Sequence, residues 1–374
     1  AGGDLPDIEC LYKEDTRSVD AILLSHSHLD HYGLLNYVDP GIPVYMSKGA
    51  ETLIKISGIF TPFGVDLPGA NTITTKKGFA VGDMKITPYL VDYSAFDALA
   101  FLVESEGKRV FYSGDFRGHG RKSVLFKKMI DDPPRAIDCL LMEGSAIGRP
   151  EQKYKTEVDV QKRIEEILRE DKKAAFIAMS SQNIDRVVSA YRACVKTGSI
   201  FVIDIYTAFI LDKLRKVSVK IPQFNWKNVR VMFFHHHAEA LEKAGYRGLL
   251  YVYNNRKIKT LDINRSKNRF LIMAGDNSIF PRVIKKIDGI EGARFIYSMW
   301  EGYLKEEFAR YCAGRGLVME TVHTSGHATV EDLKAIEGAL RPKTLVPIHT
   351  FEPEKYAELF HNAVLARDGE PVLI

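Results

Sequence analysis

The sequence is poor in cysteine and has no long apolar run, and each absence excludes a class of protein. With no C-x-x-C pair, a zinc ribbon is excluded and a disulfide scaffold is disfavoured. No stretch approaches the roughly 20 apolar residues that span a bilayer, and no signal peptide is recognisable. We therefore expect no membrane contact and a reducing, cytoplasmic setting. The cysteines are Cys10, Cys139, Cys194 and Cys312.

A large excess of charge of one sign is also absent. The chain has 52 Lys and Arg against 48 Asp and Glu, a formal net charge of +4. That balance permits a nucleic-acid partner without arguing for one. At 374 residues, with 45% hydrophobic and 27% charged residues, the composition is typical of a globular protein long enough for two domains.

Short apolar runs bounded by turn residues fill the first third of the chain and predict β-strands. Two neighbouring runs in "LAFLVESEGKRVFYS" predict a hairpin that turns at "SEGK". The strand candidates are 18–24, 42–46, 84–90, 99–104, 108–113 and 136–142.

After about residue 150 the pattern changes to strands that alternate with amphipathic helices, which predicts a separate α/β unit. From about residue 316 the pattern returns to strand, loop and helix. We therefore predict an outer domain made of residues 1–150 and 316–374, interrupted by an inserted domain over residues 151–315.

Metal-ligating side chains cluster where predicted strands end. "SHSHLDHYG" places four of them within six residues behind an apolar run, and Asp115 in "SGD" and His349 in "PIHT" follow two other strands. Strands that end at one edge of a sheet bring their loops together. Imidazoles and carboxylates suit zinc, or manganese where oxygen ligands dominate. The four clustered residues are His26, His28, Asp30 and His31.

Each of these signals also has a structural explanation. The histidine motif could be a polar surface loop, although four ligands in six residues bring no packing benefit. Asp115 could belong to an ordinary turn. His349 could be a buried histidine whose hydrogen bonds are satisfied inside the protein. Asp115 and His349 become ligand candidates mainly because the histidine motif needs further ligands to complete a metal site.

These motifs in this order resemble the metallo-β-lactamase superfamily: H-x-H-x-D-H after a strand, then "SGDF", then "PIHT". "HTSGHA" upstream of "LVPIHT", with an α/β insertion before it, is similar to the β-CASP branch, which holds ribonuclease J and RNA 3′-end processing endonucleases. The resemblance implies an α/β fold, an αββα sandwich with an inserted α/β domain. It also implies metal-dependent hydrolysis of RNA, with single-stranded RNA as the partner.

The resemblance implies a role for each residue around two ions, expected to be zinc with manganese as the alternative. His26 and His28 would hold the first ion, and Asp115 would bridge to the second. The ligands of the second ion would be Asp30, His31 and His349.

Three residues would take part in catalysis by the same resemblance. Asp30 would do so through the second ion. His327 in "TSGHA" would contact a phosphate oxygen or protonate the leaving group, and Glu143 in "MEGS" would orient it. The structural alternative for His327 is a buried polar contact in a glycine turn.

The sequence departs from the family pattern in two places. Tyr93 in "VDYS" stands where the family has the remaining histidine of the first ion. A phenol has a pKa near 10 and binds zinc poorly, so we expect a weak first site and impaired activity. This sequence also lacks the two strands that the family carries ahead of "LPDI", and we expect a truncated N-terminus or a sheet edge that a homodimer covers.

A substrate phosphate could bind outside the metal ligands. Ser181 and Asn183 precede a predicted helix whose first N–H groups are free to hold an anion, and Ser325 lies in "HTSGHA". Helix capping explains Ser181 and Asn183 equally well.

The preferred function is therefore a metal-dependent phosphodiesterase that hydrolyses RNA, similar to ribonuclease J. Two alternatives stay open. The first is a non-catalytic RNA-binding or assembly subunit, because loss of a ligand at position 93 is typical of such a paralogue. The second is a small-molecule metallo-hydrolase.

Overall fold

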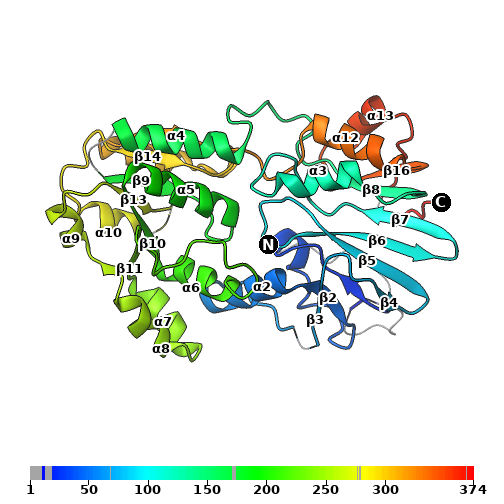
Figure 1. Cartoon of the computed structure of the whole chain (residues 1–374), viewed down its shortest axis with the longest axis horizontal. Coiled ribbons are helices and arrows are strands. Elements are labelled where there is room, and N and C mark those ends of the chain that lie inside the picture. Colours follow the sequence, from blue (N-terminus) through cyan, green and yellow to red (C-terminus); the bar gives the residue numbers. More distant parts are fainter. Residues whose placement is uncertain are drawn as a thin grey trace. The chain divides into compact units, whose positions relative to one another are not determined.

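The computed structural model in Figure 1 describes residues 11–12, 19–67, 69–170, 174–275, 277, 279–367 and 369–374. The chain forms two units, each contributed by discontinuous segments. Unit 1 consists of residues 1–118, 122–150 and 326–374, and unit 2 of residues 119–121 and 151–325. Among the described residues, no helix is both long and apolar enough to cross a membrane.

Unit 1 contains a three-stranded and a six-stranded sheet, in the orders β1-β2-β3 and β16-β8-β7-β6-β5-β4. Its elements are β1 (Ile22–Leu23), α1 (Leu29–Tyr32), β2 (Val44–Ser47), α2 (Lys48–Phe60), β3 (Asn71–Ile73), β4 (Phe79–Val81), β5 (Met84–Leu90), β6 (Leu99–Ser105), β7 (Lys108–Tyr112), α3 (Ser123–Asp131), β8 (Cys139–Glu143), α12 (Val330–Leu340), β16 (Thr344–Ile348) and α13 (Glu354–Leu359).

Three apolar clusters stack these elements into four layers. Met46 and Ile54 join the small sheet to α2, and Leu23 packs with Phe101 between the two sheets. On the far side of the large sheet, Leu140 packs with Leu333 of α12. The helices and the two sheets thus share buried apolar contacts at each boundary between layers, and the result is the predicted αββα sandwich.

The predicted hairpin is confirmed by β6 and β7, which pair antiparallel with Ser105 opposite Lys108. Glu106 and Gly107 form the two-residue turn, both at positive φ (48° and 75°). Positive φ at both central positions matches the right-handed twist of the flanking strands.

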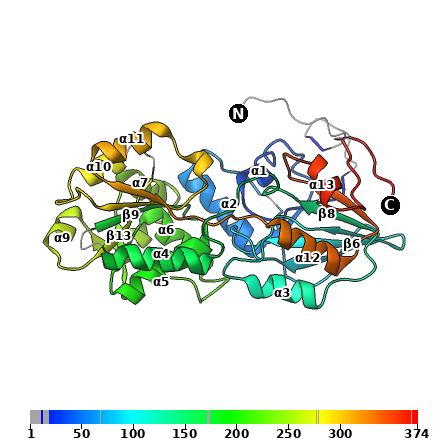
Figure 2. The same cartoon turned by 90° about the horizontal axis from the view of Figure 1, so that it is seen from above.

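Unit 2 is built on one seven-stranded sheet in the order β12-β11-β10-β13-β9-β14-β15, in which all pairs are parallel. In Figure 2, α4 and α5 cover one face, and α10 and α11 lie on the other. The elements are α4 (Glu157–Glu170), β9 (Ala174–Ala178), α5 (Ile184–Thr197), β10 (Ile200–Asp204), α6 (Ile205–Leu214), β11 (Val229–Met232), α7 (His235–Lys243), α8 (Arg247–Asn254), β12 (Lys257–Ile258), α9 (Thr260–Arg265), β13 (Phe270–Met273), α10 (Phe280–Ile284), β14 (Arg294–Tyr297), the 3-10 turn η1 (Glu301–Tyr303), α11 (Glu306–Gly314) and β15 (Val318–Thr321).

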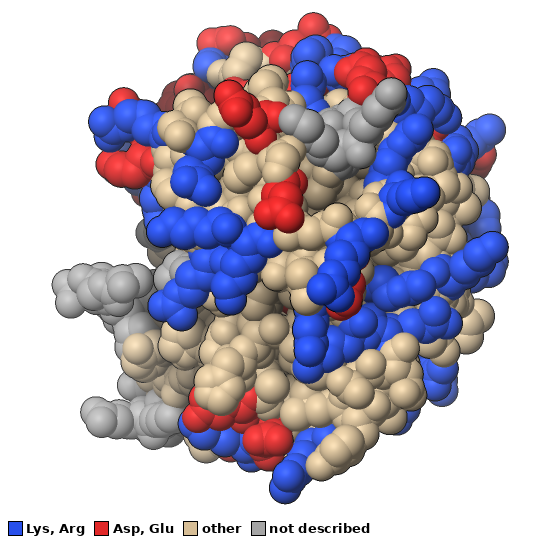
Figure 3. Space-filling model, turned by 90° about the vertical axis from the view of Figure 1, so that its left-hand side faces the viewer, with Lys and Arg blue, Asp and Glu red and all other residues tan. Residues whose placement is uncertain are grey.

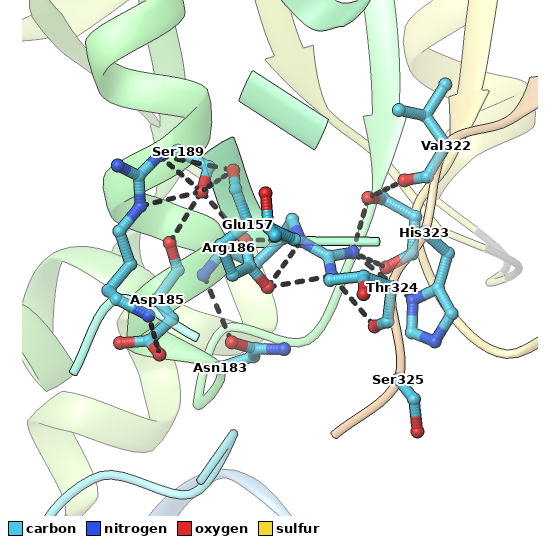
Figure 4. Close-up of polar contacts among 12 residues, drawn as sticks. Glu157, Asn183, Asp185, Arg186, Ser189, Val322, His323, Thr324 and Ser325 are labelled. Atoms are coloured by element: carbon cyan, nitrogen blue, oxygen red, sulfur yellow. Dashed lines mark hydrogen bonds and ion pairs between the residues drawn. The ribbon is translucent and has the colours of Figure 1, made fainter. Parts of the chain in front are cut away.

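A buried ion pair links α4 and α5 to the segments that follow β14 and β15 (Figure 4). Glu157 at the start of α4 and Arg186 in α5 are both fully buried, and their charged atoms lie 2.9 Å apart. Arg186 also donates hydrogen bonds to the carbonyls of Ser298 and Thr324, so its charge is satisfied inside the unit.

The predicted boundary at residue 316 is ten residues too early. β15 pairs in register with β14, Val318 opposite Arg294, so residues up to 325 belong to unit 2. The sequence did not separate this edge strand from the loop that follows it. Cys139, Cys194 and Cys312 are buried, and none of the three is in a disulfide, whereas Cys10 and the segment ahead of "LPDI" lie outside the described residues.

Candidate metal centre

The candidate ligands lie at one edge of the six-stranded sheet of unit 1. β7, β8 and β16 are parallel neighbours, so their carboxyl ends meet at the same edge. Asp115 follows β7, Glu143 ends β8, and His349 directly follows β16. β5 runs in the same direction because β6 is antiparallel to both β5 and β7, and it delivers Tyr93 to this edge.

The histidine motif reaches this edge from the smaller sheet. After β1, the carbonyl of Ser25 accepts a hydrogen bond from the N–H of Leu99 (2.9 Å), which fixes the loop against β6. α1 is a single turn that carries Asp30 and His31.

A glycine is required beside Asp115. Gly114 has a φ of +55°, and a Cβ there would lie 2.6 Å from the carbonyl oxygen of Leu99. Only glycine fits both conditions without moving backbone, so "SGD" is a constrained turn that aims Asp115 inward.

The structure brings segments more than 300 residues apart in the chain to one point. The Nε2 of His349 lies 3.4 Å from Oδ2 of Asp30, and its Nδ1 lies 3.1 Å from Oδ1 of Asp115. Oδ2 of Asp115 lies 3.3 Å from Nε2 of His31 and 3.7 Å from Nε2 of His26. Asp115 is therefore the centre of the cluster.

Three sets of these residues could each hold a metal ion, because within each set the ligand atoms all lie within 4.8 Å of one another. The second group below is the ligand set predicted for the second ion, apart from the bridging Asp115. His28 belongs to none of the three. The groups are His26, His31 and Asp115; Asp30, His31 and His349; and Asp115, Glu143, His327 and His349.

Buried atoms without hydrogen bonds show that a cation fits this cluster. Nε2 of His26, Nε2 of His31 and Oδ2 of Asp115 are all buried and meet the geometry of no hydrogen bond. Buried polar atoms in proteins are normally paired, and three unpaired ligand atoms facing one another are the donor set of a metal ion. The imidazole and carboxylate chemistry thus suits a divalent cation.

The electrostatics of the cluster also favour a cation. Hydrogen bonds to Asp115 and Asp30 raise the pKa of His349 to about 10. Burial lowers the pKa of His28 to about 4 and lowers the pKa of His26 well below its usual value. These two imidazoles are therefore neutral at neutral pH, which is the state in which histidine binds metal.

Tyr93 fills the space beside His28. Its hydroxyl lies 3.3 Å from Nδ1 of His28 and 3.2 Å from Nε2 of His327, and the side chain is 1% exposed. Burial and the nearby carboxylates raise the pKa of Tyr93 well above its usual value. The phenol is thus neutral and holds His28 by a hydrogen bond.

Glu143 orients His327. Its two carboxylate oxygens lie 3.1 and 3.2 Å from Nδ1 of His327, and one also accepts a hydrogen bond from the N–H of Phe116. Burial acts to lower the pKa of His327, but Glu143 and Asp115 more than offset this, and the net shift is upward. The pairing leaves Nε2 of His327 facing Tyr93.

Two orienting serines escaped the sequence analysis. Oγ of Ser25 lies 3.0 Å from Nδ1 of His26, and Oγ of Ser145 lies 2.9 Å from Nδ1 of His349. Such hydrogen bonds fix ring orientation in metal sites. Their signal was present in the sequence, since Ser25 immediately precedes His26 and Ser145 ends "MEGS".

The backbone of His349 is strained. Its φ is +48°, in the left-handed region that non-glycine residues rarely adopt. The hydroxyl of Ser145 donates a hydrogen bond to the carbonyl of His349 (3.0 Å), which helps to hold this conformation.

The three residues predicted to bind a substrate phosphate all lie in unit 2. Oγ of Ser181 contacts Oγ1 of Thr207 at 2.8 Å. Asn183 is the N-cap of α5 and accepts a hydrogen bond from the N–H of Arg186. The carbonyl of Ser325 contacts Nε2 of His119 at 3.1 Å.

Residues 8–179 match the beta-lactamase superfamily domain. The chain is 24% identical over 366 residues to Ribonuclease J of Sinorhizobium meliloti, covering 92% of this chain and 60% of that protein. It is also 24% identical over 242 residues to the transcription termination factor FttA of Methanothermobacter thermautotrophicus, covering 58% of this chain and 38% of that protein.

A crystal structure of a protein of unknown function from Enterococcus faecalis V583 has the same fold. Its TM-score is 0.76 at 23% identity, and the match covers 99% of this chain and 87% of that one. The predicted fold class is thereby confirmed. The chain spans at most about 60% of the length of the two curated relatives described above.

Proposed function

We propose that the chain is a metal-dependent phosphodiesterase of the metallo-β-lactamase superfamily that hydrolyses RNA, because residues 8–179 match the beta-lactamase superfamily domain and the chain is similar to Ribonuclease J over most of its length. In this proposal unit 1 is the metallo-β-lactamase-like domain and unit 2 the inserted β-CASP-like domain. The observation that carries it is the convergence of Asp30, Asp115 and His349 with the histidine motif, with three buried ligand atoms unpaired.

Divalent ions, zinc or manganese, would supply Lewis-acid stabilisation of a phosphate and lower the pKa of a water. His26, His31, Asp30, Asp115 and His349 would hold them. His26 and Asp115 are buried, at 0% and 2% exposed, whereas the side chain of Asp30 is 62% exposed, so solvent reaches the cluster on the side of Asp30.

His327 would handle the proton of the leaving group. Glu143 fixes Nδ1 of His327, and Nε2, on the other side of the ring, lies 3.2 Å from the hydroxyl of Tyr93. An imidazole held in one orientation by a carboxylate can hold a proton at Nε2 and donate it to a leaving oxygen. Ser181, Asn183 and Ser325 stay predictions for binding a substrate phosphate.

A non-catalytic RNA-binding protein is the second candidate, because Tyr93 occupies a ligand position and ties up Nδ1 of His28. One experiment separates the candidates. Protein reconstituted with zinc or manganese is incubated with labelled single-stranded RNA, single-stranded DNA, a chromogenic phosphodiester and a β-lactam.

Asp30→Ala is the test variant, and Asp66→Ala, which removes an exposed aspartate of unit 1 outside all three ligand groups, is the matched control. We expect metal-dependent RNA cleavage that falls at least about 100-fold in Asp30→Ala and not in Asp66→Ala. RNA binding without cleavage would support the second candidate. Turnover of the small substrates alone would contradict both.

A further inference from the structure

The near-neutral balance of the whole chain conceals one strongly basic segment. Residues 213–286 contain seventeen Lys and Arg against four Asp and Glu, whereas the complete chain has 52 against 48. The remainder of the chain is therefore net acidic. This segment lies entirely in unit 2.

Part of the segment forms a basic face on β11, β12, α9 and the loop after α9. Four of its side chains are exposed, and the two arginines that lie closest to the sheet are half-buried. Figure 3 shows Lys and Arg across the middle of this side of the molecule, with Asp and Glu gathered mainly toward its top and bottom. The basic face consists of Arg230, Arg256, Lys257, Lys259, Arg265 and Lys267.

The charges of the basic face are not neutralised within the described part of the chain, where none of the six side chains makes an ion pair with a carboxylate. Arg256 donates to the carbonyl of Asn225 and Arg230 to that of Lys227. Asp262, the acid nearest in sequence, accepts instead from the N–H of Lys259 at the cap of α9.

The two half-buried arginines repel each other. Burial lowers the pKa of Arg230, and the positive charge of Arg256 lowers it further. β12 pairs with β11 so that Lys257 stands beside Val231, which brings a third positive charge to the same edge. Neighbouring positive charges without a carboxylate partner repel one another and raise the free energy of the unbound protein. A bound polyanion would offset this repulsion and lower that free energy.

We propose that the basic face binds the phosphate backbone of single-stranded RNA and so anchors the substrate outside the metal centre. The inference rests on the proposed function, because the substrate proposed there is itself a polyanion. Tyr251 of α8, which precedes the face, is 67% exposed and offers a ring on which a base can stack. Basic side chains interleaved with exposed aromatics are typical of single-strand binding surfaces.

A simpler explanation is that the lysines only protect a sheet edge, since β12 is the short edge strand of the sheet. The two explanations differ in their salt dependence. Each phosphate contact releases counterions from a single strand, so log K falls with log salt concentration by about 0.7 per contact. Edge protection has no such effect on RNA binding.

The test variant replaces Lys257, Lys259, Arg265 and Lys267 with Gln in the full-length chain. RNA binding is measured by fluorescence anisotropy with a labelled, unstructured oligonucleotide in EDTA, over a series of KCl concentrations. We expect affinity to fall about 10-fold or more at low salt, and the slope to decrease by about 3.

Two controls accompany this variant. Charge-conserving swaps at the same positions (Lys257→Arg, Lys259→Arg, Arg265→Lys, Lys267→Arg) should bind as the wild type does. The matched control replaces four exposed lysines of unit 1 with Gln and should change the slope by less. These lysines are Lys77, Lys127, Lys128 and Lys334.

The proposal is overturned if the test variant keeps the affinity and slope of the wild type, or if the wild type binds phosphatidylglycerol vesicles through these residues and does not bind RNA. Aggregation of the test variant with unchanged RNA affinity in its soluble fraction would support edge protection instead. Failure of the proposed function is a separate result, the absence of RNA cleavage by metal-loaded wild type, because the binding assay in EDTA uses no catalysis.

Discussion

The two units differ in whether their buried charged groups have hydrogen-bonding partners. In unit 2, Arg186 is fully buried, yet its guanidinium contacts Glu157, Ser298 and Thr324. In unit 1, Asp115 is 2% exposed, and its Oδ2 has no hydrogen bond although two imidazoles face it. The charges of the first cluster are paired within unit 2, whereas the second presents unpaired ligand atoms of the kind that bind a divalent cation.

This difference separates a structural charge network from a binding site. Both clusters contain fully buried charged residues. The ionised groups of Glu157 and Arg186 are paired with each other, whereas Nε2 of His26, Nε2 of His31 and Oδ2 of Asp115 face one another without a hydrogen bond to a described residue. Substitutions in the two clusters should therefore change different measured quantities, metal content and activity in one and unfolding in the other.

The largest effect should come from Asp115→Asn, which keeps the shape of the side chain and removes its charge. We expect bound zinc to fall and RNA hydrolysis to drop about 1,000-fold, because Asp115 contacts His26, His31 and His349. Metal analysis and a cleavage assay measure both. Asp138→Asn, at a buried aspartate of unit 1 outside the ligand groups, is the control. Equal zinc content in both variants would contradict the assignment.

Arg186→Met should affect stability instead. It leaves Glu157 buried without its partner, which costs about 3–5 kcal/mol of unfolding free energy. Urea unfolding measures the loss, and metal content should not change. Arg192→Met removes an exposed arginine from the same helix and should cost less than about 0.5 kcal/mol. A similar cost for both variants would show that the network does not stabilise unit 2.

Tyr93→His restores the imidazole that the family pattern has at this position. We expect about one additional zinc ion per chain and about a 10-fold rise in RNA hydrolysis, because His28 then gains a ligand partner in place of a neutral phenol. Tyr93→Phe removes the hydroxyl without adding a ligand and should give no rise. Equal zinc stoichiometry and equal rates in wild type and Tyr93→His would reject the hypothesis.

The smallest effect concerns acid stability in unit 2. A hydrogen bond from Arg163 lowers the pKa of Glu320 from 4.5 to about 2. The ionised carboxylate of Glu320 makes its full contribution to the free energy of unfolding above pH 4.5, and this contribution is lost as the pH falls through about 2. The stability gap between wild type and Glu320→Gln should thus narrow as the pH falls from 5. Thermal unfolding at several pH values measures it, and a constant gap would exclude a role for the ionised carboxylate.

The sequence predicted the strands of unit 1 from short-range pattern, whereas the grouping of Asp30, His31 and His349 was implied by the family resemblance. Apolar runs define strands, and ligands at strand ends must converge at a sheet edge. The hydrogen bonds of Tyr93 to His28 and His327 were not predictable, since they join positions far apart in the chain and no motif marks them.

Two errors have a common cause, the averaging of a property over too long a range. The boundary at 316 was placed where the helical pattern stops, although the pairing of β15 with β14 decides it. The net charge of +4 concealed the basic segment of residues 213–286. Counting charges in shorter windows would have found that segment without a structure.

The positive φ of His349 has a consequence for ligand capture. Gly or Asn would adopt this conformation more easily, and a histidine there costs on the order of 1 kcal/mol. Because folding already meets that cost, with Ser145 holding the carbonyl, the imidazole faces Asp30 and Asp115 before any ion arrives. The site would thus be preorganised for an ion, and little binding free energy would be lost to rearrangement of the loop.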